Sequence, residues 1–571
     1  MKLNKILKTT AVVLIAAVSF TGCIKEVFPK ESAITQSQLS QSDAGLESLL
    51  KSIPSAMAAT VAASYDHSDF GYHSIGLHKD HHALTMFPCT RVDRGGNVYY
   101  SRIQAPNYGF DMGTNGGYTH YIWYNYYPYI KKANDIIGAV TIDKSEAEME
   151  ALKEYRGIAK AFRALFYIDL VGYYDSLEAK APMLPTYEAD LLKVKDYIVP
   201  IVTELTDEKA AKQNQRAKRE EMFEFILADL KDAEEIFKSY EGENVEVKPT
   251  VYGSSVTYPE LAAVYGLYAR AYLWLGGFNN LNYKNVATGE EAYRLAAEYA
   301  RKAIDAANVP IMSEMEWTNT TTGFNSVVPA WIWATQMSTD TVINNLYAFP
   351  AHVCPEASFG YGPHACVGVA SSTYDRLSNS DFRKKLIVGP NTTYADFKNY
   401  TTMSQDEWEE LAYRAPYTNF KFRPAQGERV DYMVANAISL PIMRIEERYF
   451  IEMEATAHYD EGTARTLLNT FMANRASSYV ILPTEDVVDE IIFQKSVEFW
   501  GEGKILFDMK RLNMGVDTTG QNYPSGMLFK SEGRLPWWNL PIPSGETAVN
   551  TACKETAGPD PSRGLVSEDA I

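Results

Sequence analysis

Apolar residues recur at helical spacing through most of the chain, and the pattern is clearest within Pro441–Arg511. The spacing is three or four residues at Ile442, Ile445, Tyr449 and Met453. Such spacing places side chains on one face of a helix. A second apolar run begins after Gly462 and a third run follows it. We therefore predict a helical hairpin and then a third helix that ends in a glycine-containing turn.

Charged residues accompany this apolar pattern. Arg444 stands three residues before Glu447, and Arg448 stands four residues before Glu452. Side chains three or four residues apart are neighbours on a helix, so we predict that these residues form ion pairs with each other. The carboxylates of the stretch are accordingly interpreted as structural partners of basic residues and not as acid–base groups.

Five earlier segments show helical spacing, with alanine or glycine beside large aromatic residues. They are Tyr121–Val140, Glu150–Tyr174, Glu220–Phe237, Tyr258–Leu275 and Glu291–Asp305. This composition is typical of closely packed helical hairpins of the tetratricopeptide type, although no clean repeat of that length is present. We expect Trp123, in the first segment, to lie in the core, and an insertion at Asp175–Arg219 to interrupt the array. Trp331–Ala334 alternates like a strand. The predicted fold class is mainly α, with long irregular loops and a few short strands.

Two long segments lack helical or strand spacing. Residues 64–118 are rich in glycine, histidine, tyrosine and aspartate, and residues 338–372 are rich in aromatic residues, with a mixed polar continuation to residue 435. Long irregular segments are uncommon in compact domains and often carry function. We therefore predict two loop insertions, at about 64–118 and 338–435, on a helical scaffold.

The first insertion contains a histidine cluster. Its members are His73, His78, His81 and His82. A metal site would need partners that hold each imidazole in place, and the sequence shows none. We therefore predict a solvated polar loop and no metal, with metal binding as the alternative.

The second insertion contains two His-x-Cys pairs. They are His352 with Cys354, and His364 with Cys366. Four such side chains could bind zinc in a tetrahedral arrangement. Free thiols are a second possibility, and a disulfide between Cys354 and Cys366 is a third. Outside the cell the disulfide is the prediction we favour.

The N-terminal residues have the features of a targeting leader. Lys2, Lys5 and Lys8 precede an apolar run over Ala11–Phe20 that is too short to span a bilayer. The run is followed by Phe20-Thr21-Gly22-Cys23, which is similar to a lipobox. We predict a lipoprotein signal peptide at residues 1–22 and a lipid on Cys23. An ordinary secretory signal with an incidental cysteine is the alternative.

Composition and motifs exclude several function classes. The chain has 571 residues, and its formal net charge of −18 argues against nucleic acid and anionic membrane surfaces as partners. No motif of a serine hydrolase, a zinc protease or a phosphate-binding loop is present. A glycosidase would need two carboxylates across a cleft, and sequence alone does not give that distance. We predict no enzymatic activity, no cofactor and no catalytic residue.

The C-terminal motifs resemble those of the SusD/RagB family of surface nutrient-binding lipoproteins. The residues that fit are Arg444, Glu447, Glu454-Ala455, Gly462, Leu468-Asn469, Arg475, Glu490, Glu498, Glu502, Gly503, Asp508, Leu540–Pro543, Glu546 and Asn550. Met472, Gln494 and Ile505 depart from the family pattern and remove charged partners. The resemblance implies one SusD-like domain over residues 23–571.

The resemblance also implies a function. Such proteins capture oligosaccharides at the outer membrane, facing outside the cell, and pass them to a SusC-like TonB-dependent transporter. A peptide-binding member of the same family is the main alternative, and a surface hydrolase is a further one.

In the family, loops that correspond to the two insertions carry the ligand. Aromatic rings can stack on the C–H faces of a sugar, while amides bind its hydroxyls. The predicted ligand-binding residues are Tyr99, Tyr100, Tyr108, Asn97, Asn107, Tyr347, Phe349 and Tyr361. Each ring could instead pack against its own loop.

Overall fold

The computed structural model describes most of the chain after residue 41. The described residues are 42–58, 71–83, 87–90, 112–179, 185–241, 248–279, 281, 283–342, 349–359, 365–523, 528 and 530–561. The predicted signal peptide and Cys23 lie outside these residues.

The described elements alternate long helices with short strands and turns. In the first half they are α3 (Asp43–Ala58), α4 (Tyr72–His82), β1 (Phe87–Thr90), α7 (Gly117–Thr141), α8 (Glu146–Ala151), α9 (Lys153–Tyr174), α10 (Pro185–Lys193), β2 (Tyr197–Pro200), α11 (Glu208–Ala211), β3 (Arg216–Lys218), α12 (Arg219–Lys238), α13 (Leu261–Gly276) and α14 (Gly289–Ala307). In the second half they are α15 (Glu314–Thr318), β4 (Trp331–Gln336), α16 (Phe349–Val353), β5 (Ala365–Gly368), α17 (Ser371–Arg376), α18 (Tyr394–Phe397), α19 (Gln405–Arg414), α20 (Tyr432–Ala435), β6 (Ser439–Arg444), α21 (Ile445–Ala457), α22 (Glu461–Met472), α23 (Val487–Glu498), α24 (Leu506–Arg511) and α25 (Ser544–Val549).

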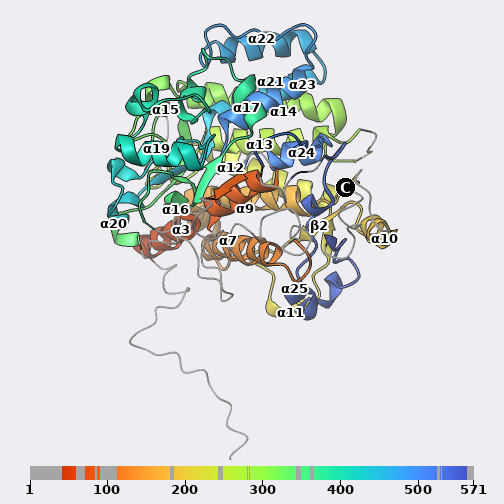
Figure 1. Ribbon diagram of the computed structural model, residues 1–571. Coiled ribbons are helices and arrows are strands. Elements are labelled where there is room, and N and C mark those ends of the chain that lie inside the picture. The colour runs from red at the N-terminus through yellow and green to blue at the C-terminus, as the bar shows by residue number, and fades with distance from the viewer. Residues whose placement is uncertain are drawn as a thin grey trace, which may run out of the picture.

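The long helices form a stack that runs through the molecule. Helix α9 packs against α7 and α12, α13 packs against α12 and α14, and α21 packs against α14, α22 and α23. In Figure 1 this order runs from the orange helices at the bottom to the blue α22 at the top. The five earlier helical segments predicted from apolar spacing are confirmed, although Glu150–Tyr174 is divided between α8 and α9, and the predicted third helix of the C-terminal stretch is divided between α23 and α24. The molecule is mainly α.

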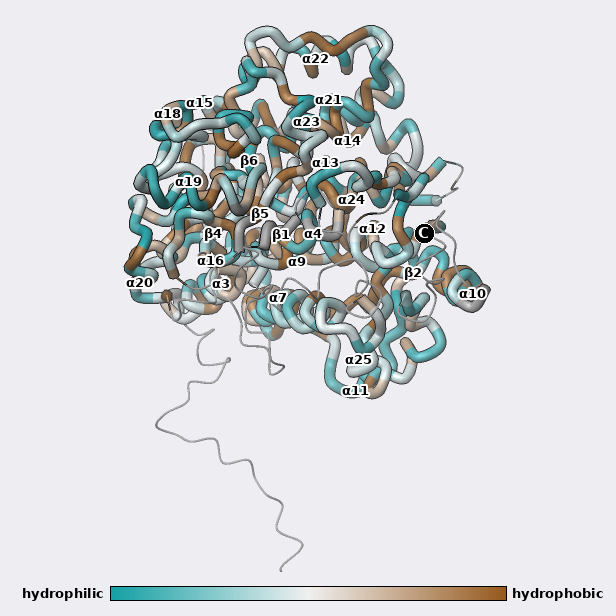
Figure 2. The backbone as a smooth tube through the Cα atoms, in the orientation of Figure 1, coloured by the Kyte–Doolittle hydropathy of each residue, from teal (hydrophilic) through white to brown (hydrophobic). Residues whose placement is uncertain are grey.

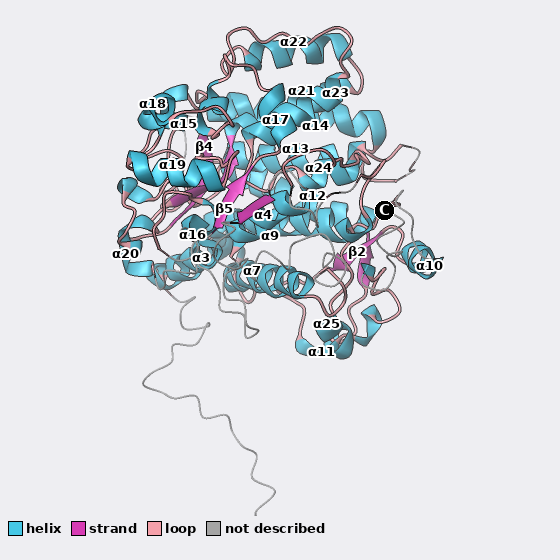
Figure 3. Ribbon diagram, viewed as in Figure 1, coloured by secondary structure: helices cyan, strands magenta, loops and turns pink. Residues whose placement is uncertain are grey.

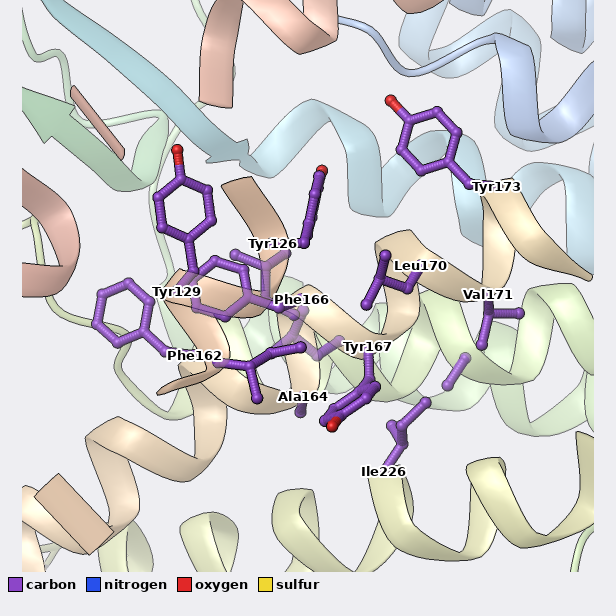
Figure 4. Packing of buried hydrophobic residues seen from close by; sticks show 14 of the residues in the cluster. Tyr126, Tyr129, Phe162, Ala164, Phe166, Tyr167, Leu170, Val171, Tyr173 and Ile226 are labelled. Atoms are coloured by element: carbon purple, nitrogen blue, oxygen red, sulfur yellow. The ribbon is translucent and has the colours of Figure 1, made fainter. Parts of the chain in front are cut away.

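Small residues let these helices approach closely. A Cβ atom added at Gly276 of α13 would lie 2.4 Å from the ring of Tyr293 on α14. Figure 4 shows the aromatic core between α7 and α9, where Tyr126, Tyr129, Phe162 and Phe166 lie side by side. Trp123 is buried in the same core, as predicted. In Figure 2 hydrophilic and hydrophobic residues alternate along α7, as expected for a helix with one buried face.

The described strands form three two-stranded antiparallel sheets, which pair β1 with β5, β2 with β3, and β4 with β6 (Figure 3). The predicted strand at Trp331–Ala334 is confirmed as part of β4. However, Pro441–Arg444 belongs to β6 and not to the predicted helix. Its backbone pairs with β4, with Ala334 opposite Pro441 and Trp331 opposite Arg444. Pairing with a distant strand therefore overrides the local helical spacing.

The first insertion is not the uniformly irregular, solvated loop that we predicted. It contains α4 and β1, and Ile75, Leu77 and His78 of α4 are buried. Asp80 is buried as well, and its carboxylate accepts a hydrogen bond from the backbone N–H of Gly503 at 3.0 Å. The helix escaped prediction because Ser74, His78, Lys79 and Asp80 are buried along with its apolar residues, so polar and apolar positions do not separate into two faces. The second insertion likewise contains α16 to α20 and β5.

The favoured disulfide between Cys354 and Cys366 is wrong, because Cys354 is a buried free thiol. It packs among Ala351, Ala357 and Phe359, and burial raises the pKa of the Cys354 thiol to about 12. A zinc ligand must be a thiolate, so this environment also opposes the zinc alternative. Within the described residues, no helix is both long and apolar enough to cross a membrane.

Candidate functional site

The β1–β5 ribbon brings the two insertions together. Its strands pair antiparallel, with Phe87 opposite Gly368 and Thr90 opposite Ala365. Residues 91–111, which carry five of the predicted ligand residues, follow β1 directly, and residues 360–364 directly precede β5. The strand that leads into residues 91–111 therefore pairs with the strand that follows residues 360–364, and this ribbon lies between α16 and α17 in the view of Figure 3.

Hydrogen bonds fix the β5 side of the ribbon to the body of the protein. The N–H of Asn419 donates to the carbonyl of Val367 at 3.2 Å, and the N–H of Val369 donates to the carbonyl of Tyr417 at 3.1 Å. The N–H of Ser371 donates to the side-chain oxygen of Asn522 at 2.7 Å. This strand is consequently part of the rigid scaffold.

A buried carboxylate fixes residues 354–359, which follow α16. Glu356 accepts hydrogen bonds from Arg423 at 2.7 Å, from the Thr401 hydroxyl at 2.8 Å and from the Thr402 N–H at 2.6 Å. The carboxylate is fully buried, and although burial opposes ionisation, the Arg423 guanidinium and these donors lower the pKa of Glu356. Charge-assisted hydrogen bonds of this kind hold residues 354–359 in one position.

Polar bonds also fix the other insertion, through α4. The Tyr72 hydroxyl donates to Asp169 of α9 at 3.1 Å, and Nε2 of His73 lies 2.7 Å from the Thr335 hydroxyl of β4. Burial and the nearby Lys504 lower the pKa of His73 to about 3, so the ring is neutral at physiological pH. The histidine thus serves as a neutral hydrogen-bonding link between α4 and β4.

The cavities among the described residues differ in what they could hold. One of about 20 Å³ lies between α3, α4, β4, α16 and β6, and has room for a single water. Another of about 90 Å³ lies between α4, α9 and α13, and is lined by charged residues including Lys79, Asp169, Arg270 and Glu447. Both are far smaller than the roughly 300–1,000 Å³ of small-molecule sites. Neither accommodates an oligosaccharide.

A surface groove of about 550 Å³ lies between α10 and residues 554–560. Its aromatic residue, Tyr187, is buried and donates its hydroxyl hydrogen to the Pro536 carbonyl at 2.7 Å. The charges of Lys193 and Asp190 neutralise each other in an ion pair of 2.7 Å. Among its described lining residues the groove therefore offers no exposed ring on which a sugar could stack.

Most of the predicted ligand residues are not described by the structure. Tyr99, Tyr100, Tyr108, Asn97, Asn107, Tyr347 and Tyr361 lie outside the described residues. The exception is Phe349, and the prediction of an exposed ring is wrong there. Its ring is 7% exposed and packs edge-on against Phe422, with ring centroids 4.9 Å apart. Phe349 is a core residue of α16 because the first turn of that helix faces the body of the protein.

Two tyrosines beside β5 escaped sequence prediction. Tyr374 of α17 and Tyr417 lie with their ring centroids 5.6 Å apart, and both are half-buried. The carbonyl of Tyr417 bonds to the residue that follows β5, and its φ of 68° lies in the left-handed region, which is uncommon for a residue with a side chain. No local signal joins two rings so far apart in sequence, so only the pairing of β5 with this segment reveals them.

The motif carboxylates lie elsewhere, inside the protein. Glu498 is completely buried, and it pairs with Arg475 at 3.0 Å, Arg383 at 3.2 Å and Arg444 at 3.4 Å. These guanidinium groups lower the pKa of Glu498 although burial opposes ionisation. Gln494, which departs from the family pattern, accepts a hydrogen bond from Arg383 at 2.6 Å. As predicted, these carboxylates are structural partners of basic residues.

The partners themselves differ from those we predicted. Glu447 pairs with Arg270 of α13 at 2.7 Å, and Glu452 pairs with Arg301 of α14 at 2.5 Å. Arg444 pairs with Glu446, Glu498 and Glu502. The predicted pairs along one helix are therefore wrong, because these side chains face other elements and not the solvent-exposed side of α21. Within the described part of the chain, no three or more histidine, cysteine or acidic residues are arranged to hold a metal ion.

Comparison with known proteins establishes the fold. No family model matches the sequence, and no curated protein matches it. A SusD-like carbohydrate-binding protein from Bacteroides vulgatus is 18% identical, with a TM-score of 0.62 over 90% of this chain and 97% of its own. A SusD superfamily protein from Bacteroides thetaiotaomicron is 17% identical, with a TM-score of 0.63 over 89% and 98%. The chain has the SusD fold.

The chain is also similar in structure to surface glycan-binding protein A from B. thetaiotaomicron, which was solved in complex with laminarihexaose. That protein is 16% identical, with a TM-score of 0.57 over 91% of this chain and 99% of its own. The fold predicted from the C-terminal motifs is thus confirmed across nearly the whole chain.

Proposed function

We propose that the chain is a glycan-binding protein that captures oligosaccharides without cleaving them. The observation that carries this proposal is the β1–β5 ribbon, which joins the two aromatic-rich insertions on a rigid SusD scaffold. The glycan-bound relative with the same fold supports oligosaccharide as the ligand class. The buried, paired motif carboxylates favour a binder over a hydrolase, since they serve as ion-pair partners in the interior.

The proposed site extends from the ribbon over the loops that it joins. Tyr99, Tyr100, Tyr108, Tyr347 and Tyr361 would supply stacking rings, and Asn97 and Asn107 would bind sugar hydroxyls. We add Tyr374 and Tyr417, which lie beside β5 and are half-exposed. Rings on separate segments of one rigid face can bind successive sugars of a chain without a deep pocket.

Calorimetric titration of the purified protein tests this proposal. Laminarihexaose, other oligosaccharides and a set of peptides are titrated into the parent and into the Tyr99→Ala, Tyr100→Ala and Tyr361→Ala variants. Loss of one stacking ring should weaken glycan binding by about 1 kcal/mol, roughly fivefold. Tyr124→Ala is the control, because Tyr124 is 43% exposed on the framework helix α7.

The outcomes separate the alternatives. Peptide binding that depends on the same rings would favour the peptide-binding alternative. Parent-like glycan affinity in all three variants would place the site elsewhere. A hydrolytic activity that copurifies with the protein would contradict a non-catalytic role if substitution of one carboxylate abolishes that activity.

The proposal includes attachment to the outer membrane, facing outside the cell, through a lipid on Cys23 after cleavage of residues 1–22. Mass spectrometry of the membrane-fraction protein tests this part, and an unmodified Cys23 would contradict it. Cys23→Ala should release the protein into the soluble fraction, because acyl chains supply the membrane affinity of such proteins.

The proposal also includes a SusC-like TonB-dependent transporter as partner, which would receive the captured oligosaccharide. Gentle detergent extraction should yield the protein together with a large outer-membrane protein. Repeated isolation of the protein alone, with its lipid intact, would count against this partner.

A further inference from the structure

We propose that Cys89 and Cys366 form a disulfide that covalently links β1 to β5. The inference rests on the backbone register of the ribbon, in which Cys89 stands directly opposite Cys366. It concerns a different pair from the one that sequence favoured, and it does not depend on what the protein binds.

The backbone spacing of such a pair suits a disulfide. Directly opposed residues of an antiparallel pair have Cα atoms about 4.5 or about 5.5 Å apart, depending on whether their backbone groups bond to each other. Disulfides join Cα atoms about 4.4–6.8 Å apart. The Cα–Cα distance of a directly opposed pair therefore suits a disulfide without movement of the strands, whether or not the two residues bond to each other through their backbones.

The remaining cysteines are unsuitable partners. Cys354 is a buried free thiol enclosed by Ala351, Ala357 and Phe359. Cys553 is also a buried free thiol, and its Sγ lies 3.4 Å from the carbonyl oxygen of Asn214. Cys23 is the predicted lipid attachment site. Of the five cysteines in the sequence, register therefore pairs the two that lie in β1 and β5.

The bond forms by oxidation of two thiols. Cys89 and Cys366 together lose two protons and two electrons as the S–S bond forms. The oxidant is an exchangeable disulfide of a thiol oxidoreductase outside the cytoplasm, which is reduced to two thiols in the exchange. The predicted leader sends the chain to a compartment where such exchange occurs.

A covalent link at this position would act on both insertions at once. Cys89 lies just before residues 91–111, and Cys366 lies just after residues 360–364. The ribbon has only four residues in each strand, and a two-stranded pair of this length is marginal alone. The disulfide would therefore keep the strand that leads into residues 91–111 beside the strand that follows residues 360–364 when the backbone pairing opens.

Peptide mapping of the full-length protein, purified without reductant, tests the proposal. Free thiols are first blocked with iodoacetamide in denaturant. Trypsin then releases a peptide with Cys89, but it leaves Cys354 and Cys366 on one peptide because no lysine or arginine lies between them. Cleavage after Glu356 by a glutamate-specific protease separates these two cysteines.

We expect the Cys89 and Cys366 peptides to be joined, with Cys354 and Cys553 alkylated. Reduction before alkylation should convert the joined species into two alkylated peptides, which is the matched control. Alkylation of both Cys89 and Cys366 in the unreduced protein would overturn the proposal, as would a link from Cys366 to Cys354. Since the measurement uses the parent protein, it does not depend on whether a variant folds.

Discussion

The interior of the C-terminal helices and the face around the β1–β5 ribbon differ in the exposure and the partners of their side chains. Inside, Glu498 is completely buried and surrounded by Arg383, Arg444 and Arg475. Around the ribbon, Tyr374 and Tyr417 are half-exposed and lie beside the entrances of two long loops. The motifs that identify the fold are therefore those that hold it together, and the residues proposed to bind ligand lie outside them.

This difference has a physical origin. A buried charge needs a partner in a fixed position, so the interior network constrains which residue types can occupy it. Stacking on a sugar needs only an exposed ring on a rigid support, which many sequences can supply. The two regions should consequently respond in different ways to substitution.

The largest effect should come from Glu498→Gln. The change leaves three buried guanidinium groups without their shared negative partner, and breaking such a network costs about 3–5 kcal/mol of unfolding free energy. Glu461→Gln is the control, because Glu461 pairs with Arg465 on the exposed face of α22 and such a pair contributes about 0.3–0.5 kcal/mol. Urea unfolding measures both, and equal losses would contradict the distinction between interior and surface.

Gly503→Ala should cause the next largest loss of unfolding free energy. Gly503 has φ of 67°, and an added Cβ would lie 2.4 Å from the carbonyl oxygen of Gly76 in α4. Gly520 has nearly the same φ, 68°, but open space around it. Both substitutions introduce about 1–2 kcal/mol of backbone strain, and Gly503→Ala should cost about 1–3 kcal/mol more through overpacking. Similar unfolding free energies for the Gly503→Ala and Gly520→Ala variants would contradict the expected overpacking and would show that α4 can move away from the added methyl group.

A third effect should be confined to acid solution. The pKa of His73 is about 3 in the folded protein and about 6.5 when unfolded, so the unfolded chain binds the proton first. Stability from the neutral ring is present above about pH 6.5 and is lost as pH falls toward about 3. The stability difference between the parent and His73→Gln should therefore shrink with falling pH in urea unfolding. If the unfolding free energies of the parent and His73→Gln change in parallel with pH, the pKa of His73 is not lowered by folding.

The smallest effect should be on ligand binding. Tyr374→Ala should weaken binding of laminarihexaose by about 1 kcal/mol, because a stacking ring is removed. Tyr374→Phe keeps the ring and should bind like the parent, which separates stacking from hydroxyl hydrogen bonding. Calorimetric titration measures both variants, with urea unfolding to confirm that each is folded. Equal loss in the phenylalanine variant would assign the effect to the hydroxyl group.

Sequence alone determined the helical framework of this protein. Apolar spacing predicts α7, α9, α12, α13 and α14, because a helix repeats every few residues and its buried face is therefore visible locally. The resemblance of the C-terminal motifs to those of the SusD/RagB family likewise implied the SusD fold, because the motifs can be recognised in order along the sequence.

Tertiary structure decided which distant residues meet. Arg270 rather than Arg444 pairs with Glu447, and Cys89 rather than Cys354 stands opposite Cys366. Such pairs depend on strand register and helix packing, which are set by burial across the whole molecule and leave no periodic signal along the chain. For the same reason α4 remained hidden: its Ser74, His78, Lys79 and Asp80 are buried together with its apolar residues, so polar and apolar positions do not separate into two faces.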